Sequence, residues 1–333
     1  MCGIIGVWSP DTESLLEILL SGVDYLHRRG PEGKGAGLVN PIRETLISNR
    51  ANTDKEKAEF KATIKRMAYD IRAKMALGQT RYITDERYES EVLLRTNTQP
   101  MHLWFEREFG ITQEAIGIHN GNIRQKERLT DLIGPRTRSK ADVDTRPLIE
   151  LTMEYLRKEV SDWDAVKRVM EALLDVDGAA SVGFSAGDSL IAFRDPQGYR
   201  PLVLGRVGDA HVFVSESGFF NEAAAIFGYD NVEITGSIKP GEMVRIDPEG
   251  ILERRILLDI GEDNHRPCAF EEFYIKRGDC LAECGSISVR RIREQQGIDI
   301  GNFYREELQG VSTVIPVEKS GIIYAQGLAL ALG

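Results

Sequence analysis

The sequence predicts an α+β protein in which antiparallel sheets are covered on their outer faces by layers of helices. The first observation is that helical and strand-like segments occur in separate blocks along the 333 residues. The second is a series of short strand-like segments between residues 179 and 215, separated by Gly, Asp or Pro turns. The third is a composition of 42% hydrophobic and 28% charged residues, which is ordinary for a folded globular chain.

The chain begins with a predicted buried strand, which a helix follows. Residues 2–8 form an apolar run, and Ser9-Pro10 then supplies an N-cap and a proline at the first helical position. The next segment has an apolar stripe at helical spacing and ends at Gly30-Pro31. The stripe comprises Leu15, Leu16, Leu19, Val23 and Leu26.

The middle of the chain predicts further helices and several short strands. Residues 54–72 alternate charged and apolar side chains with the period of an amphipathic helix. Two more helices are predicted between the sheet segments, because their apolar residues have the same period. These helices cover residues 146–159 and 163–174, and the strands cover residues 115–123, 179–184, 189–193, 201–204 and 211–215.

A polar, loop-like stretch around residues 259–266 predicts a domain boundary. The first domain then covers residues 2–258, and a second, partial domain covers residues 266–333. In the second region we expect helices over residues 287–296 and 322–332 and a strand over residues 312–317. Such a strand and helix would be the start of an α/β pattern.

Charge and hydropathy exclude two classes of partner. The net charge of −10 and the pI near 5.2 are unfavourable for binding a nucleic acid backbone. No apolar run approaches the roughly 20 residues of a membrane span, and no basic segment follows Met1. The sequence therefore predicts a cytoplasmic protein without nucleic acid or membrane partners.

The cysteines and histidines give little indication of a metal site. Cys268 precedes the C-x-x-x-C pair Cys280 and Cys284, so a metal or iron–sulfur site at these three residues is left open. The CxxC pairs of common zinc sites are missing, and the five histidines form no His-x-x-x-His pair. We therefore predict no metal ligands.

Cys2 is a candidate nucleophile. Small residues at position 2 permit removal of Met1, which would leave a free α-amine and a thiol on one residue. The α-amine has an ordinary pKa of about 7.7–8.0, so it can accept the thiol proton near neutral pH. Taken alone, a cysteine at this position is more often incidental, and its significance depends on other residues.

Asn120-Gly121 has two compatible interpretations. Asn-Gly between alternating apolar residues is the leading signal for a tight hairpin turn. An Asn side-chain amide and a Gly backbone N–H directed at one point also form an oxyanion hole. The sequence predicts both from the same two residues.

Arg81 and Asp144 are candidate ligands for an amino acid. A guanidinium can bind an α-carboxylate through two parallel hydrogen bonds, although an exposed, solvated arginine is the commoner case. Asp144 precedes a predicted helix, where it is either a helix-start residue or a ligand for an α-ammonium group. Both alternatives remain open from the residues alone.

Four motifs occur in this order along the chain, at residues 1–7, 26–32, 80–82 and 119–122. In their order and spacing they resemble the motifs of class II glutamine amidotransferases. The resemblance implies a four-layer αββα N-terminal-nucleophile hydrolase domain that hydrolyses L-glutamine, with no cofactor at this site. It implies Cys2 as nucleophile, and Asn120 with Gly121 as oxyanion hole. It also implies Arg81, Asp144, Arg29 and Thr84 as substrate-binding residues.

Further similar strings are residues 191–202, 215–217, 240–242, 266–271 and 314–317. Within this class they resemble the amidophosphoribosyltransferases, and the last two resemble the entry into that family's phosphoribosyltransferase domain, so the resemblance implies that residues 266–333 are a partial phosphoribosyltransferase-like domain. That family transfers ammonia to phosphoribosyl pyrophosphate (PRPP) in the first step of de novo purine biosynthesis, and Mg²⁺ is expected only for a complete phosphoribosyltransferase site. The resemblance also implies a homo-oligomer or a partner synthase subunit.

The sequence departs from the family at several points. It has Arg28-Arg29-Gly30 where His-Arg-Gly is usual, and Asp85-Glu86 after Thr84 where a glycine is usual nearby. The acidic pair and Gly-Thr-rich loop that hold PRPP are not in this sequence, so we expect glutamine hydrolysis without phosphoribosylamine synthesis. The alternatives are a stand-alone glutaminase subunit serving a partner such as a glutamate synthase, and a non-catalytic, truncated relic.

Overall fold

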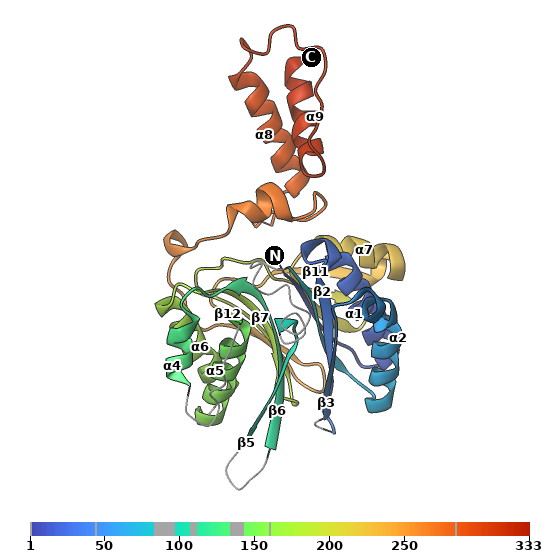
Figure 1. Cartoon of the computed structure of the whole chain (residues 1–333), viewed down its shortest axis with the longest axis vertical. Coiled ribbons are helices and arrows are strands. Elements are labelled where there is room, and N and C mark those ends of the chain that lie inside the picture. The colour runs from blue at the N-terminus through green and yellow to red at the C-terminus, as the bar shows by residue number, and fades with distance from the viewer. Residues whose placement is uncertain are drawn as a thin grey trace.

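The computed structural model describes residues 2–43, 45–82, 97–106, 112–133, 143–159, 161–283 and 285–333. Two sheets lie face to face, and helices cover the outer face of each (Figure 1). The pairs of neighbouring strands are antiparallel. This four-layer arrangement confirms the predicted fold class.

The first sheet contains β1 (Gly3–Trp8), β2 (Gly33–Asn40), β3 (Thr45–Ala51), β4 (Met75–Arg81), β9 (Val203–Val207), β10 (Ala210–Val214) and β11 (Val232–Ser237). The second sheet contains β5 (Met101–Glu106), β6 (Thr112–Asn122), β7 (Ala179–Ser185), β8 (Leu190–Arg194), β12 (Glu242–Ile246) and β13 (Leu252–Ile256). The strand orders are β11-β9-β10-β1-β4-β2-β3 and β13-β12-β8-β7-β6-β5. Strand β1 therefore lies in the interior of its sheet.

Among the described residues, three helices cover each sheet. Those on the first sheet are α1 (Thr12–Tyr25), α2 (Asp54–Ile71) and α7 (Gly218–Phe227), and those on the second are α4 (Lys126–Leu132), α5 (Thr145–Lys158) and α6 (Asp162–Asp175). The short 3-10 helix η1 (Leu26–Arg29) follows α1 directly. Apolar side chains fill one layer between each sheet and its helices and a third layer between the two sheets.

The apolar periodicity of α1 and α2 was predicted correctly, but α1 begins later in the chain than predicted. The apolar stripe of α1 is buried, as expected, and α2 begins with a capping box formed by Thr53 and Glu56. The N-cap of α1 is Asp11, which accepts a hydrogen bond from Ser14 N at 2.8 Å, so the expected start at Ser9-Pro10 was wrong by two residues. The reason is that a carboxylate caps as well as a hydroxyl.

Residues 266–333, here called the C-terminal region, extend away from the two sheets (Figure 1). This region contains a π-helix, η6 (Glu271–Ile275), followed by α8 (Val289–Phe303) and α9 (Gly321–Leu332), which pack against each other. The two expected helices are confirmed. The strand expected over residues 312–317 was wrong, because this segment is irregular and no strand among the described residues lies beside it to form a ladder.

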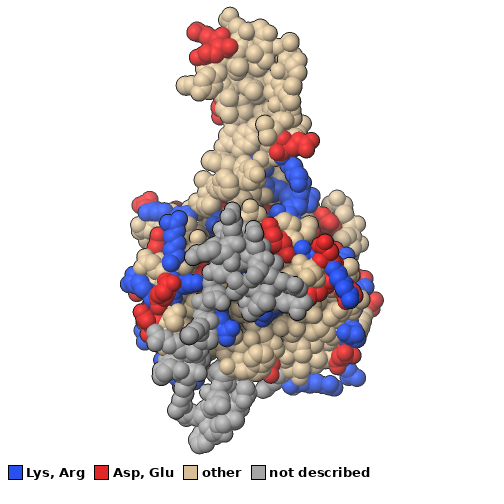
Figure 2. Space-filling model, in the orientation of Figure 1, with Lys and Arg blue, Asp and Glu red and all other residues tan. Residues whose placement is uncertain are grey.

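The surface of the C-terminal region differs from that of the sheets and their helices. Figure 2 shows charged side chains distributed over the lower part of the molecule, whereas the region of α8 and α9 presents mostly uncharged atoms on this face. Ile315 and Val317 are 83% and 84% exposed, and Phe303 is 79% exposed. These apolar side chains lack cover from the described residues.

Candidate active site

Strand β1 places Cys2 at the edge of the space between the two sheets. Gly3 and Ile4 pair with Thr80 and Gln79 of β4. Ile4 faces the apolar layer between the sheets, and side chains alternate along a strand, so Cys2 lies on the same face as Ile4. Cys2 is half-buried, and its backbone carbonyl accepts a hydrogen bond from Arg29 Nε at 2.9 Å.

Arg81 lies at the end of β4, beside the start of β1. It follows Thr80, the partner of Gly3, and it pairs on its other side with Gly33 of β2. Leu77 belongs to the layer between the sheets, so Arg81, which is four residues along the strand, lies on that face too. The side chain is buried. The predicted carboxylate ligand is therefore next to the predicted nucleophile.

Asn120 reaches the same space from the opposite sheet. Ile116 and Ile118 of β6 belong to the layer between the sheets, and Asn120 continues their face. The side chain is only 1% exposed. Its Nδ2 atom is buried and has no hydrogen-bond partner within the described ranges. A buried N–H donor without a partner is unusual, because leaving one unpaired is energetically unfavourable.

The hairpin turn predicted at Asn120-Gly121 was wrong. Strand β6 continues through Asn122, and Asn120 and Gly121 pair with Ser181 and Ala180 of β7. The glycine is required for a different reason, because a Cβ at position 121 would lie 1.8 Å from the Ala179 carbonyl oxygen. The two residues thus occupy the interior of the sheet.

Hydrogen bonds hold the backbone immediately before Asn120. His119 N donates to the Gln99 side-chain oxygen, and Gln99 Nε2 donates to His119 O at 3.1 Å and to Thr145 Oγ1 at 2.9 Å. The His119 ring contacts Ala179 O at 3.1 Å through Nε2. Sequence analysis missed Gln99 and Thr145, since neither belongs to a motif with a chemical signature.

Asp144 connects the end of β6 to the start of α5. Its Oδ2 accepts a hydrogen bond from Ile123 N at 2.8 Å, directly after the strand that carries Asn120. It precedes α5, but its side chain forms no capping hydrogen bond. The local structure thus gives Asp144 a fixed position at the strand end, while its predicted substrate contact stays a prediction. Thr84 lies outside the described residues.

Arg29 does not have the environment of a substrate-binding side chain. It is 4% exposed, and its guanidinium donates to Glu216 at 2.7 Å and to Glu271 at 2.8 and 3.0 Å, in addition to Cys2 O. Burial alone would lower the pKa of Arg29, but the charges and hydrogen bonds of Glu271 and Glu216 together outweigh this effect. The pKa of Arg29 is therefore raised above its usual value, and the guanidinium remains charged. This geometry favours a role in positioning Cys2 over the predicted substrate contact.

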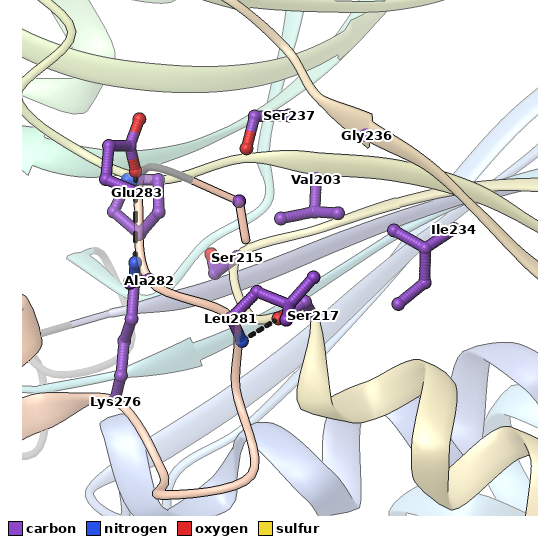
Figure 3. A pocket seen from close by; sticks show the side chains of 12 residues that line it. Val203, Ser215, Ser217, Ile234, Gly236, Ser237, Lys276, Leu281, Ala282 and Glu283 are labelled. Atoms are coloured by element: carbon purple, nitrogen blue, oxygen red, sulfur yellow. Dashed lines mark hydrogen bonds and ion pairs between the residues drawn. The ribbon is translucent and has the colours of Figure 1, made fainter. Parts of the chain in front are cut away.

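Ser215 and Ser217 lie beside the start of β1 and line a cavity of about 200 Å³ (Figure 3). Ser215 and Ser217 face this cavity together with Lys276 and Glu283 from the C-terminal region. A larger cavity of about 750 Å³ lies between the Arg29 region and the C-terminal helices, and Tyr82 lines it. Residues of the C-terminal region line both cavities, so this region lies close to the candidate site.

Cys280 is buried beside Glu216 and Tyr25. Its Sγ lies 3.4 Å from Glu216 Oε2 and 3.6 Å from Tyr25 Oη. Burial and the charge of Glu216 raise the pKa of the Cys280 thiol well above its usual range. Because the thiolate is the reactive form, this cysteine is chemically protected. Cys284 lies outside the described residues.

The described residues contain no group of three His, Cys, Asp or Glu side chains close enough to hold a metal ion. In the same described part, no helix combines the length and apolar character of a membrane span.

No model of a known protein family matches the chain. Its whole length is 28% identical to an amidophosphoribosyltransferase of Archaeoglobus fulgidus, of which it covers 65%, and 26% identical to that of Bacillus subtilis, of which it covers 62%. The chain is homologous to the amidophosphoribosyltransferases. It spans 54% to 66% of the length of the curated amidophosphoribosyltransferases compared with it.

Two solved structures share the fold. One, described as the allosteric regulatory enzyme of purine biosynthesis, aligns with a TM-score of 0.76 at 24% identity, over 99% of this chain and 63% of its own. The other is the glutamine PRPP amidotransferase of B. subtilis in complex with ADP and GMP, with a TM-score of 0.74 at 24% identity, over 99% of this chain and 64% of its own. At this identity the likeness establishes the fold alone.

Proposed function

We propose that this chain hydrolyses glutamine to glutamate and ammonia through a thioester on Cys2, as the glutaminase of an amidophosphoribosyltransferase. The observation that carries the proposal is the buried Nδ2 of Asn120, which has no hydrogen-bond partner among the described residues and lies, on the opposite sheet, across the space that Cys2 and Arg81 face. An N–H donor in this position is suited to an oxyanion that forms during reaction. Homology over the whole chain supports the same activity.

The reaction begins when the Cys2 α-amine accepts the thiol proton and the thiolate attacks the glutamine side-chain amide carbon. Asn120 Nδ2 and the Gly121 N–H stabilise the oxyanion of the tetrahedral intermediate. The C–N bond then breaks, the α-ammonium gives its proton to the departing nitrogen, and ammonia and a glutamyl thioester result. Water activated by the same amine attacks the thioester and releases glutamate.

Substrate recognition uses opposite charges beside the nucleophile. The planar guanidinium of Arg81 binds the α-carboxylate of glutamine through two hydrogen bonds. Asp144, fixed by Ile123 N at the end of the strand that carries Asn120, binds the α-ammonium group. Glutamine is thereby held by its amino-acid end, with its side-chain amide directed toward Cys2.

The acceptor of the ammonia belongs to the proposal as well. The name amidophosphoribosyltransferase, carried by the homologous proteins, indicates transfer to PRPP and hence the first step of purine biosynthesis. We assign the glutaminase chemistry to residues 2–258 and treat residues 266–333 as the part that belongs with the acceptor site. Association with further copies of the chain fits the same proposal.

The test is to purify the chain with Met1 removed, to measure glutamate release from glutamine, and to map labelling by a diazoketone analogue of glutamine. We expect turnover, with the label on Cys2 and none on the buried Cys280. A Cys2→Ser variant should lose both, and a Cys268→Ser variant should keep both. Folded chain that neither hydrolyses glutamine nor takes the label on Cys2 would refute the proposed function.

A further inference from the structure

We infer that Glu271, in the C-terminal region, positions the nucleophile Cys2 through Arg29, so that the glutaminase site includes residues beyond position 258. The inference rests on the proposed function for its catalytic consequence. Its structural part, which is that the start of β1 is held from the C-terminal region, rests on geometry alone.

Arg29 connects three groups through one rigid plane. Its Nε donates to Cys2 O at 2.9 Å, and its two terminal nitrogens bind Glu216 at 2.7 Å and both oxygens of Glu271 at 2.8 and 3.0 Å. A guanidinium is planar, so its terminal nitrogens cannot change direction without moving Nε. The two carboxylates therefore determine where Nε lies and, through it, where the Cys2 carbonyl lies.

Glu271 is the stronger of the two anchors. It is 2% exposed, it accepts two hydrogen bonds from Arg29, and Arg200 lies 3.5 Å from the same carboxylate. Burial alone would raise the pKa of Glu271, but the charge and hydrogen bonds of Arg29, with Arg200 and Lys276, lower it below its usual range. The carboxylate is thus charged at neutral pH and holds Arg29 in a bidentate contact.

A second set of contacts connects the same two regions. Ser215 Oγ accepts a hydrogen bond from Ile4 N at 3.0 Å, and Ser215 N donates to Ile4 O at 3.0 Å. Ser217 Oγ accepts from Leu281 N at 2.7 Å, as Figure 3 shows. Three consecutive residues, 215–217, therefore contact the nucleophile strand on one side and the C-terminal region on the other.

The strand has little room to absorb a displacement. A Cβ at Gly3 would lie 2.9 Å from Leu26 Cβ and 3.0 Å from Thr80 Oγ1, so the backbone beside Cys2 is closely packed. A shift of Arg29 is therefore transmitted to Cys2. Misplacement of a reacting group by about 1 Å lowers turnover on the order of 10²-fold.

The experiment compares Glu271→Gln with Glu272→Gln in the full chain. Both residues lie in the π-helix, but Glu272 contacts Lys276 at 2.5 Å and the Glu283 backbone at 3.1 Å, with no bond to Arg29 among the contacts of the described residues. We expect Glu271→Gln to lower kcat and the rate of Cys2 labelling about 10- to 100-fold, with KM changed less than about threefold. Glu272→Gln should change neither.

A second measurement is independent of catalysis. Amide hydrogen exchange of the peptide that contains residues 2–8 should become faster in Glu271→Gln and stay unchanged in Glu272→Gln. Exchange and kcat that both equal those of the unmodified chain would overturn the inference. If Glu271→Gln does not fold, Glu271→Asp, which is one methylene shorter, is measured in its place. A parent chain inactive on glutamine would refute the proposed function, while the exchange comparison would still decide the role of Glu271.

Discussion

Replacement of Gly121 by alanine tests the placement of the candidate oxyanion hole within the sheet. An added Cβ would lie 1.8 Å from the Ala179 carbonyl oxygen and 2.3 Å from His119 Nε2. Neither neighbour is free to move, since Ala179 O lies in the paired strand β7 and the His119 ring contacts that oxygen at 3.1 Å. Strands β6 and β7 must therefore separate at this point.

The size of the effect follows from these distances. Real Cβ contacts essentially never fall below 3.0 Å, so the strands must separate by about 1.2 Å beyond the 1.8 Å of the structure. Overpacking of this kind destabilises a protein by about 1–3 kcal/mol. For a domain of this size, 2 kcal/mol corresponds to a lowering of the Tm by roughly 4–8 °C. Displacement of the neighbouring Asn120 amide should lower kcat on the order of 10²-fold.

Thermal unfolding and glutaminase kinetics measure the two effects separately. The matched control is Gly321→Ala at the start of α9, where the nearest atom to the added Cβ is Val317 Cβ at 3.8 Å. This variant should keep the Tm within about 1–2 °C and the full kcat, because surface substitutions rarely exceed about 0.5 kcal/mol. A Gly121→Ala chain with the stability and turnover of the parent would refute both the strand pairing and the location of the site.

Three further outcomes follow. Asn120→Ala should lower kcat by about 10²–10³-fold, whereas Arg81→Lys and Asp144→Asn should chiefly raise KM. Steady-state kinetics in which Asn120→Ala raises only KM, or the other two variants lower only kcat, would contradict the assigned roles. A chain that retains Met1, or carries a tag confirmed as uncleaved before Cys2, should fold but lose glutaminase activity, because a peptide bond removes the basicity of the amine. The lowered pKa of Glu271 means that its stabilising contribution is present above the ordinary glutamate pKa of 4.5 and is lost as pH falls through the lowered value. Urea titrations should therefore show that the stability gap between the parent and Glu271→Gln narrows below about pH 4.5, and a gap that is constant with pH would contradict this.

Local patterns predicted the helices α1, α2, α5, α6, α8 and α9 and the strands β1 and β6 to β10, because the periodicity of apolar residues reflects which face is buried. The helices α4 and α7 and the remaining strands were missed. The stripe of α1 and the charged face of α2 are examples, and both helices pack against the first sheet. The nucleophile, the carboxylate ligand and the oxyanion residue were proposed from their chemistry and their family resemblance. The structure directs Cys2 and Arg81 from one sheet and Asn120 from the other toward the same space between the sheets, and their catalytic and binding roles stay predictions.

Two predictions were wrong because strand pairing with distant parts of the chain, which the local sequence does not show, decides the structure at those positions. Asn120-Gly121 has the sequence of a turn, but glycine is required here by the close approach of Ala179 O from a strand about 60 residues distant. Residues 312–317 have the composition of a strand, yet no neighbouring strand pairs with them among the described residues. A strand needs partners for its backbone groups, and periodicity within one segment does not reveal them.

The environment of Arg29 was beyond sequence reasoning for the same reason. Its motif suggested substrate binding, but its contacts come from Glu216 and Glu271, which are 187 and 242 residues away in the chain. Charge pairs at such separations leave no local pattern. Only the tertiary structure shows that the guanidinium is fully engaged by the protein.

The string at residues 191–202 supported the family resemblance, and the structure gives it a structural role. Arg194 is 1% exposed, and it donates to the carbonyls of Gly198 and Ile238, both at 2.7 Å. It also pairs with Glu283 of the C-terminal region at 2.8 Å. One buried side chain thus holds a turn of its own string, the segment before β12 and the C-terminal region together.

This arrangement requires an arginine, because only a fork of several N–H donors can satisfy two carbonyls and a carboxylate in different directions. In Arg194→Lys, the single ammonium group cannot reach all of them, so at least one buried acceptor loses its partner. An unsatisfied buried group of this kind destabilises by about 1–3 kcal/mol. Urea unfolding should show this loss, whereas Arg206→Lys, at a side chain that is 46% exposed, should be nearly neutral. If Arg194→Lys and Arg206→Lys have the same free energy of unfolding, the buried contacts of Arg194 do not stabilise the protein as argued.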